Sequence, residues 1–466
     1  MNEASSFPSR REFIKTSGRI AVAGAFAGMA VPYVHAAGND TLQVALIGCG
    51  GRGTGAVADA MSVNNGPVKL VAMADVFPHR LNQSYESLSR EHGDKVDVPK
   101  ERQFIGFDGY QHAMDCLKPG DIVILTTPLA FRWVHFPYAI QKGLHVFMEK
   151  PLCADGPSAR KMLALADQAT VKNLKVGVGL MSRHSRAIQE CAQRAHDGEL
   201  GDIIFMRGYR MFGLGGSAFS TKWPGGSPNE LLWQISRFHS FIWASGGLFN
   251  DFYIHIVDHL CMVKNDWPVS AQALGGCHYR RNREGQLFVD QNFDTYSVEY
   301  TFADGAKMLM DGRCMDGAKE IYSSYAHGSK GMAVVSASGD CGFPSSIHSA
   351  QFANAGNATW TSRVAKEEMN PYVNEWNDLV DAIRNDKPYN ECPRGVQASV
   401  VCNMGRMAAH TGQEVTYDQT LNHPDAYAPD ADKFTMDSLP PLRSNEDGVY
   451  PVPMPGILKD HEYAQG

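Results

Sequence analysis

A short apolar strand that runs directly into a glycine-rich turn is the feature that most constrains the fold of this chain. Residues Val44–Ile47 are apolar, and Gly48, Gly50 and Gly53 follow with the spacing G-x-G-x-x-G. In a βαβ unit the first glycine permits a tight turn, the second lets the backbone approach a pyrophosphate, and the third lets the next helix pack closely on the strand. The spacing therefore predicts a dinucleotide-binding unit, with a purely structural turn as the alternative.

The residues that follow the turn extend this pattern. A helix is expected over Gly55–Met61, and a second apolar strand, Val68–Ala74, ends in Asp75, 22 residues beyond the last glycine. A carboxylate at this distance is placed to accept a hydrogen bond from the ribose 2′-hydroxyl of the adenosine. Because a carboxylate also repels a 2′-phosphate, Asp75 favours NAD. His79 and Arg80 follow closely and keep NADP as the alternative.

The first 36 residues have the pattern of a removable export signal. Arg10 and Arg11 form a twin-arginine sequence, an apolar run extends from Ile20 to about Val31, and residues 34–36 have the pattern of a cleavage site. We expect export to the periplasm, with an uncleaved anchor as the alternative, although the run is short for a membrane span. Substrates of this route cross the membrane folded. We therefore expect a tightly bound cofactor and a turnover that is redox-neutral or reset by a second substrate.

Charge and cysteine usage narrow the class of protein. Without residues 1–36 the chain has 39 basic and 48 acidic residues, a formal charge of −9. This acidic balance argues against nucleic acid or an anionic membrane surface as a partner. The ten cysteines are scattered without a C-x-x-C pair, which suits a protein that folds before export.

The length after the signal, about 430 residues, predicts two domains. Apolar strands alternate with helical stretches over residues 40–170, which predicts a doubly wound parallel sheet. Residues 171–415 predict an α/β domain with a large open mixed sheet, and residues 416–466 a tail that wraps the surface or meets a partner subunit. The expected strands are 44–47, 69–74, 122–126 and 145–148, then 202–209, 271–278, 295–302, 306–313 and 332–336, and later helices are expected at 187–195, 372–385 and 395–410.

Several motifs in one order give the chain a specific resemblance. After the glycine turn and Asp75 they are Thr127-Pro128, His135, Gly143-Leu144-His145-Val146, Glu149-Lys150-Pro151-Leu152, Gly198-Glu199-Leu200-Gly201 and Asp251-x-x-x-His255-x-x-Asp258. From Val44 to about Thr416 the chain resembles the glucose–fructose oxidoreductase, inositol dehydrogenase and MocA (Gfo/Idh/MocA) family. The resemblance implies a Rossmann domain followed by a mixed α/β domain whose open sheet faces the nicotinamide. It also implies a homo-oligomer, a dimer or tetramer, that forms through the outer face of this sheet.

The resemblance also implies catalytic roles. Oxidising an alcohol requires a proton acceptor and a cation beside the developing alkoxide. Lys150 follows a strand at the carboxyl edge of the sheet and would polarise the substrate oxygen, while His255 would shuttle the proton. Positions 251, 255 and 258 share one helix face, so Asp251 would orient the imidazole or a sugar hydroxyl and Asp258 would brace the base. Tyr253 departs from the family, which usually has a small residue there, and this leaves the pocket shape open.

Further candidates come from the motifs and from an aromatic-rich stretch, residues 223–252. Aromatic rings can pack on the apolar face of a pyranose, with core packing as the alternative. His255 and His259 have the i, i+4 spacing of metal ligands, but no third-ligand motif accompanies them, so no metal is expected. The candidate cofactor-binding residues are Gly48, Gly50, Gly51, Arg52, Gly53, Asp75, Thr127, Pro128, His135, Glu149 and Lys150, and the candidate substrate-binding residues are Arg183, Trp233, Arg237, His239 and Asp258.

Three classes of function remain open. The first is an exported NAD(P)-dependent oxidoreductase that acts by hydride transfer on a sugar, polyol or related carbohydrate. The second is an NAD-dependent glycoside-cleaving enzyme of the same fold, which oxidises its sugar transiently and releases an aglycone without net redox change. The third is a non-catalytic nucleotide- or sugar-binding protein, against which the presence of both Lys150 and His255 counts.

Overall fold

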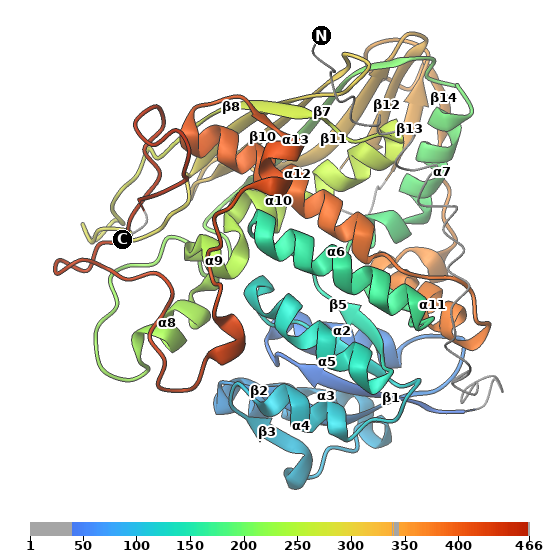
Figure 1. Cartoon of the computed structure of the whole chain (residues 1–466). Coiled ribbons are helices and arrows are strands. Elements are labelled where there is room, and N and C mark those ends of the chain that lie inside the picture. Colours follow the sequence, from blue (N-terminus) through green and yellow to red (C-terminus); the bar gives the residue numbers. More distant parts are fainter. Residues whose placement is uncertain (1–39, 338, 340–343, 465–466) are drawn as a thin grey trace, which may run out of the picture. The chain divides into compact units, whose positions relative to one another are not determined.

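Two β-sheets organise the protein in the computed structural model, which describes residues 40–337, 339 and 344–464. Within these residues one sheet has six strands and the other nine (Figure 1). The expected signal peptide, residues 1–36, lies outside the described residues. The two sheets confirm the predicted fold class, a Rossmann-type parallel sheet followed by an α/β domain with a large mixed sheet.

The first sheet is parallel throughout and has the strand order β3-β2-β1-β4-β5-β6. Its central strands are apolar on both faces, as a sheet covered by helices on both sides requires. Strand β6 extends this sheet beyond the predicted domain boundary at residue 170. The strands are β1 (Leu42–Ile47), β2 (Val68–Asp75), β3 (Gln103–Ile105), β4 (Ile122–Leu125), β5 (His145–Met148) and β6 (Val176–Val178), and the helices are α2 (Gly51–Met61), α3 (Pro78–His92), α4 (Gly109–Asp115), α5 (Arg132–Lys142) and α6 (Gly156–Val171).

A late helix, α11 (Pro371–Arg384), returns to this first domain. Its Trp376, Leu379 and Ile383 side chains belong to the same buried cluster as the apolar residues of β1 and α2. The Trp376 ring stacks on Phe147 of β5 with centroids 4.5 Å apart. The first domain is therefore completed by residues that the sequence pattern assigned to the second.

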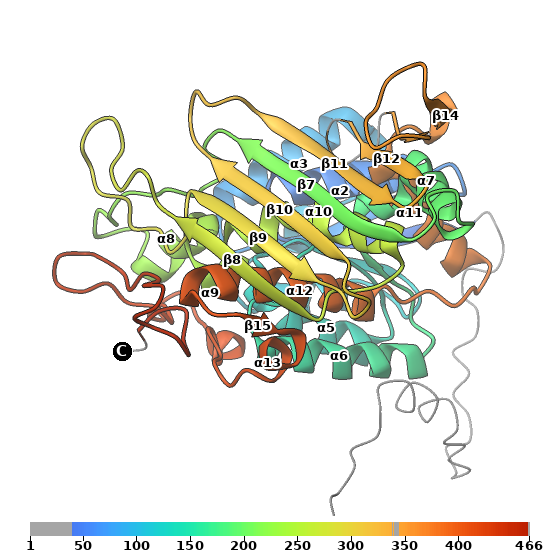
Figure 2. The same ribbon diagram turned by 90° about the horizontal axis from the view of Figure 1, so that it is seen from above.

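The second sheet is mixed, with the order β14-β13-β12-β11-β7-β10-β9-β8-β15. β7 and β10 pair in parallel, and every other pairing is antiparallel. Helices α10 and α12 cover one face, and Figure 2 shows the other face uncovered. The elements are α7 (Arg186–His196), β7 (Ile203–Phe212), α8 (Glu230–Ser236), α9 (Ile242–Ser245), α10 (Gly247–Lys264), β8 (Ser270–Gly276), β9 (Thr295–Thr301), β10 (Lys307–Cys314), β11 (Ile321–Gly328), β12 (Gly331–Ser336), β13 (Ser346–His348), β14 (Ala358–Thr361), α12 (Cys392–Thr411), β15 (Val415–Thr416) and α13 (Tyr417–Asn422).

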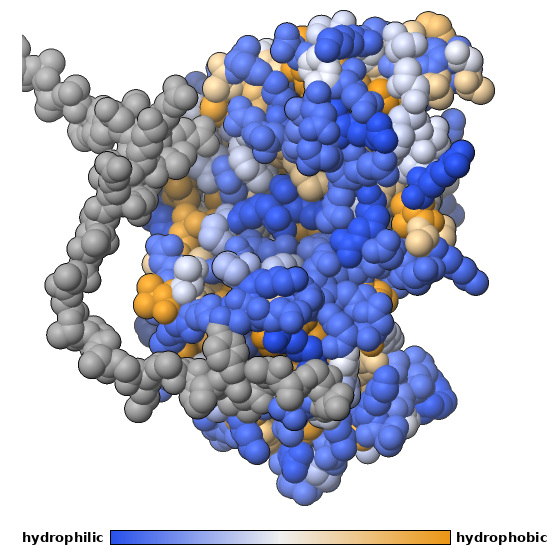
Figure 3. All heavy atoms as spheres, turned by 90° about the vertical axis from the view of Figure 1, so that its right-hand side faces the viewer, coloured by the Kyte–Doolittle hydropathy of each residue, from blue (hydrophilic) through white to orange (hydrophobic). Residues whose placement is uncertain are grey.

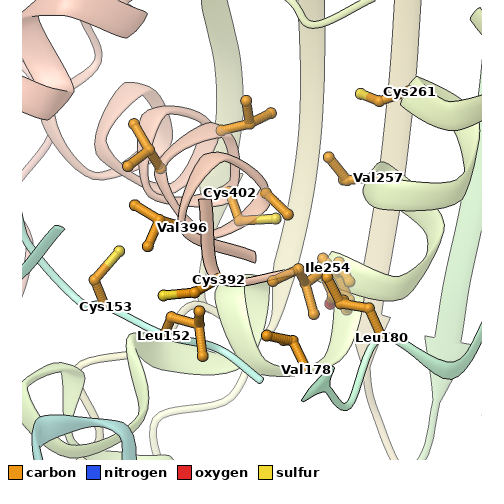
Figure 4. Close-up of a cluster of buried hydrophobic side chains, with 14 of the residues drawn as sticks. Leu152, Cys153, Val178, Leu180, Ile254, Val257, Cys261, Cys392, Val396 and Cys402 are labelled. Carbon is orange, nitrogen blue, oxygen red and sulfur yellow. The ribbon is translucent and has the colours of Figure 1, made fainter. Parts of the chain in front are cut away.

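A buried hydrophobic cluster joins the two domains (Figure 4). Leu152, two residues after Lys150, lies in it together with Val178 of β6. Ile254 and Val257 of α10 and Cys402 of α12 complete the contact from the other side. This packing fixes the first turns of α10 beside the carboxyl edge of the first sheet, where the predicted catalytic residues lie.

The C-terminal tail packs against the rest of this chain, and a buried ion pair holds it near the end of its described part. Glu462 is 1% exposed and accepts hydrogen bonds from Arg406, at 2.7 Å, and from the Tyr427 hydroxyl, at 2.6 Å. His410 Nδ1 lies 2.8 Å from the other Glu462 oxygen. A buried carboxylate with a buried cationic partner holds a segment much more firmly than an exposed pair does.

The face that carries α7, α11 and β14 is mainly hydrophilic where its described residues are in view. Figure 3 shows mainly hydrophilic side chains there, with small, separate apolar groups among the described residues in view. Among the described residues, no helix is both long and apolar enough to cross a bilayer.

The contact between α11 and the turn Met181–His184 predicts a pH-dependent stability. Burial alone would lower the pKa of His184, but the Glu391 and Asp378 carboxylates, at 3.3 and 2.6 Å, raise it to about 9. The stabilisation is therefore complete below the unfolded value of 6.5 and is lost as pH rises through about 9. We expect the difference in unfolding free energy between wild type and His184→Gln, measured with urea, to shrink over this range. A difference that stayed constant with pH would contradict the assignment.

Candidate active site

The glycine-rich turn between β1 and α2 has the geometry that the sequence predicts. Gly48 has a φ of +97°, and a Cβ at Gly53 would lie 2.1 Å from the Gly48 carbonyl oxygen. A Cβ at Gly50 or Gly51 would meet no atom within 4 Å, and both residues face a cavity of about 860 Å³. Two of the glycines thus make the turn, and the other two leave open space in front of the N-terminus of α2.

Asp75 ends β2 beside this turn. Its carboxylate accepts hydrogen bonds from the backbone N–H groups of Cys49, at 2.6 Å, and Phe77, at 2.8 Å. Burial is the largest influence on the Asp75 carboxyl and raises its pKa above the ordinary value, against these hydrogen bonds. His79 and Arg80 line the same end of the cavity, so both candidate determinants of the NAD/NADP choice are present.

The wall that follows β4 is built around a buried arginine. Arg132 donates to the Thr127 hydroxyl at 3.0 Å and to the Glu149 carbonyl at 2.9 Å, and it thereby joins the ends of β4 and β5. His135 lies next to it, with its ring centroid 4.4 Å from that of Tyr110. Burial and the Arg132 charge lower the pKa of His135 to about 3, so the ring is neutral.

Arg52, at the start of α2, contacts three carboxylates. Its guanidinium lies 2.5 Å from Glu149, 3.2 Å from Asp59 and 3.1 Å from Glu375 of α11. Arg52 and Glu149 both line the cavity. Arg52 therefore connects the cavity lining to α11, the helix that returns from the second domain.

Lys150 meets Asp251 where the two domains join. Its ammonium donates to the Asp251 backbone carbonyl at 2.7 Å and lies 3.4 Å from the Asp251 Oδ1 atom. An ammonium group has three N–H donors, so one donor remains for a further acceptor. Burial alone would raise the pKa of Asp251, but Lys150 and the hydrogen bond from His239 outweigh it and hold the pKa well below its ordinary range.

His255 lies one turn further along α10 and lines the same cavity. It is 8% exposed, and its Nδ1 atom has no hydrogen-bond partner within the described part of the chain. Burial and the Lys150 charge lower the pKa of His255 well below its ordinary value, so the imidazole is a neutral base. A cation with a free donor and a neutral imidazole thus face one space, which is the arrangement required to remove a proton from a polarised hydroxyl.

Four of the predicted substrate-binding residues lie away from the cavity lining. Arg183 forms a bidentate ion pair with Asp258, at 2.8 and 2.7 Å. Trp233 is buried in an aromatic cluster with Phe241, and the Arg237 side chain is exposed to solvent. His239 does line the cavity, but its two ring nitrogens already have partners, Ser217 and Asp251.

The cavity also contains residues that the sequence did not indicate. Ser217 and Phe238 come from segments before and after α8, and Tyr372 comes from α11. Tyr110 and Phe131 add aromatic rings beside His135. No local spacing connects these positions to the glycine turn, because only the tertiary fold brings them there.

Metal-ligating side chains do not gather into a site within the described part of the chain. Among residues 40–337, 339 and 344–464, no group of three or more His, Cys, Asp or Glu side chains is placed to hold a metal ion. The His259 Nε2 atom lies 2.7 Å from the Ser324 hydroxyl, and of the two histidines His255 lines the cavity.

The residues present fit a nicotinamide dinucleotide. The open space in front of Gly50 and Gly51 is where backbone would approach a pyrophosphate, at the positive end of the α2 dipole. Asp75 lies where the adenosine ribose is expected, and Lys150 lies at the other end, where the two domains join. A bound dinucleotide would therefore place its adenosine ribose by Asp75, its pyrophosphate in front of Gly50 and Gly51, and its nicotinamide toward Lys150.

Sequence comparisons agree with this geometry for the first domain. A family model described as "Oxidoreductase family, NAD-binding Rossmann fold" (GFO_IDH_MocA) matches residues 19–180. A curated relative, a "Glycosyl hydrolase family 109 protein" of Shewanella pealeana, is 32% identical over 166 residues. The match covers 31% of this chain and 34% of the relative, so the chain spans about a third of the relative's length. These matches support the resemblance to the Gfo/Idh/MocA family.

Solved structures with the same fold cover most of the chain. A levoglucosan dehydrogenase in complex with NADH and levoglucosan has a TM-score of 0.60 and 17% identity, and covers 82% of this chain and 100% of its own. An aldose-aldose oxidoreductase from Caulobacter crescentus, complexed with glycerol, also has a TM-score of 0.60 and 17% identity. This match covers 81% of this chain and 100% of the other. A myo-inositol 2-dehydrogenase from Lactobacillus plantarum has a TM-score of 0.58 and 20% identity, and the match covers 81% of this chain and 99% of that one. At these identities the likeness shows the fold.

The turn geometry predicts different effects for two glycine substitutions. Gly53→Ala places a Cβ against the Gly48 backbone, and we expect it to lower the unfolding free energy by about 1–3 kcal/mol or more. Gly50→Ala has open space and a φ of −73°, so the stability of the nucleotide-free protein should change by less than about 0.5 kcal/mol.

The same Gly50→Ala variant should bind NAD about tenfold more weakly, because the new methyl group occupies the space in front of α2, and a tenfold change corresponds to about 1.4 kcal/mol. Urea unfolding and calorimetric titration with NAD measure the two quantities. Wild-type affinity in Gly50→Ala would mean that the nucleotide backbone does not approach this turn.

Proposed function

We propose that this protein is an exported member of the Gfo/Idh/MocA family, an NAD-dependent oxidoreductase with a tightly bound cofactor. Its substrate is a sugar, polyol or related carbohydrate, which it oxidises at a secondary alcohol. The convergence of Lys150, Asp251 and His255 on the cavity that the glycine-rich turn and Asp75 also line carries the proposal. The sugar and inositol dehydrogenases among the structural neighbours support the carbohydrate class.

In this reaction the protein handles the proton and the developing negative charge. The remaining Lys150 N–H donates to the substrate hydroxyl oxygen and stabilises it as it becomes an alkoxide. The neutral His255 accepts the hydroxyl proton. The nicotinamide ring, when bound, supplies the hydride acceptor. Asp251 compensates the Lys150 charge, so that the ammonium can be buried beside the substrate.

A second candidate is an NAD-dependent glycosidase of the same fold. The similarity to the glycosyl hydrolase family 109 protein favours it, and Lys150 and His255 would serve the transient oxidation step equally well. Its signature is release of the aglycone from a nitrophenyl glycoside with no net change in the redox state of the nucleotide. If the protein binds no nucleotide, the remaining interpretation is a non-catalytic binding protein.

The export and cofactor parts of the proposal are tested together by the nucleotide content of the exported protein. We expect the mature protein, purified from the periplasm and denatured, to release one equivalent of NAD, identified by mass spectrometry and absorbance. Release of NADP would instead identify the cofactor as NADP and assign recognition of its 2′-phosphate to His79 and Arg80. A protein that is empty and also fails to bind added nucleotide would overturn the redox function.

Substitution of the reactive residues should abolish chemistry without loss of the cofactor. We expect Lys150→Met and His255→Gln each to slow reduction of the bound nucleotide by about 10²–10⁴-fold. The assay uses a panel of glucose, myo-inositol, levoglucosan and glycerol. Lys433→Met, which removes an exposed lysine paired with Asp430, is the matched control and should leave the rate unchanged. Equal rates in Lys150→Met and this control would show that the proposed site is wrong.

A further inference from the structure

His239 lies beside Asp251, and both of its ring nitrogens have partners. Its Nδ1 atom accepts a hydrogen bond from the Ser217 backbone N–H at 3.0 Å and lies 2.9 Å from the Ser217 hydroxyl. Its Nε2 atom lies 3.1 Å from the Asp251 Oδ2 atom. The ring therefore joins the segment before α8 to the first turn of α10.

The partner of Nδ1 determines where the ring carries its proton. A backbone N–H can only donate, so Nδ1 has to be the unprotonated acceptor. The neutral imidazole then carries its proton on Nε2 and donates it to Asp251. With both nitrogens used in this way, His239 offers a substrate hydroxyl neither a donor nor an acceptor.

The two oxygens of Asp251 are thereby assigned to different partners. Oδ2 accepts from His239, and Oδ1 faces the Lys150 ammonium at 3.4 Å. Without the imidazole, the carboxylate could rotate and bring both oxygens toward the ammonium. Lys150 would then be drawn toward Asp251 and away from the space that it shares with His255.

The surrounding loop holds His239 in this place. Gly216 has a φ of +55°, and a Cβ there would lie 2.5 Å from the imidazole Cε1 atom. The Phe238 and Phe252 rings flank the imidazole at centroid distances of 3.8 and 5.2 Å. Asn292 donates to the His239 backbone carbonyl at 2.6 Å, so both the backbone and the ring are fixed.

We propose that His239, oriented by Ser217, is a positioning residue for the reaction. It donates through Nε2 to Asp251 and so keeps the Lys150 ammonium turned toward the substrate oxygen. This inference rests on the proposed function, because the positioned group is the one that polarises the hydroxyl. It assigns His239 a role different from the substrate contact that the sequence predicted.

Two substitutions separate positioning from a merely structural role. His239→Gln places an amide N–H near the Nε2 position and can still donate to Asp251, whereas His239→Asn is too short to reach it. Using whichever carbohydrate of the panel reduces the bound nucleotide, we expect kcat to fall about 10–100-fold in His239→Asn, with KM and bound nucleotide unchanged. His239→Gln should stay within about threefold of wild type. His112→Gln, an exposed residue of α4, is the control.

Equal losses in the two variants, wild-type rates in both, or a loss confined to KM would overturn the proposal. A second measurement needs no substrate and so stays informative if the proposed function fails. In [¹⁵N]histidine-labelled protein, the ring nitrogen shifts of His239, assigned by comparison with His239→Gln, should report an unprotonated Nδ1 and a protonated Nε2. A protonated Nδ1 would contradict the hydrogen-bond chain, whatever reaction the protein catalyses.

Discussion

The pairing of Lys150 with Asp251 is the interaction on which the rest of the site depends. Lys150 lies two residues beyond the end of β5 in the first sheet, and Asp251 lies near the start of α10 in the second domain. A buried ammonium is costly unless a partner compensates its charge and satisfies its hydrogen bonds. The aspartate supplies both, through a carboxylate oxygen and its backbone carbonyl. The pair can form only when the two domains are correctly packed, so chemistry at this position depends on the whole fold.

The cluster around Leu152, Ile254 and Cys402 explains how this packing is maintained. Leu152 follows Lys150 by two residues and Ile254 follows Asp251 by three, and together with Cys402 of α12 they lie in a core that α10, α12 and β6 share. Apolar contact therefore aligns the domains, and the polar groups are positioned as a consequence. Along α10 the environment changes within two turns. Asp251 and His255 face the cavity, while Asp258 pairs with Arg183.

The sequence predicts best those parts of the site that local spacing determines. The glycine turn, Asp75 and the Asp251–His255 spacing on α10 each follow from a few consecutive residues, and the strands 44–47 and 145–148 come within two residues of their observed bounds. The sequence analysis lists no strand at β11, β13 or β14. Strand β11 has the largely polar sequence IYSSYAHG, β13 and β14 are only three and four residues long, and β14 is largely exposed, without an alternating pattern. Ser217 and Tyr372 reach the cavity through tertiary folding, for which a single sequence contains no spacing signal. The same holds for the Arg183–Asp258 pair.

The return of α11 to the first sheet has a consequence for how this protein can be divided. The family match ends at residue 180, which suggests a self-contained nucleotide-binding module. Yet the Phe147 ring of β5 stacks on Trp376, and Arg52 at the glycine-rich turn lies 3.1 Å from Glu375 of α11. A fragment that ended at residue 180 would lack Trp376 and so expose the Phe147 ring to water, and Arg52 would lose one of its three carboxyl contacts. The two domains are therefore interlocked along the chain, and a fragment that is to contain the intact first domain has to include α11.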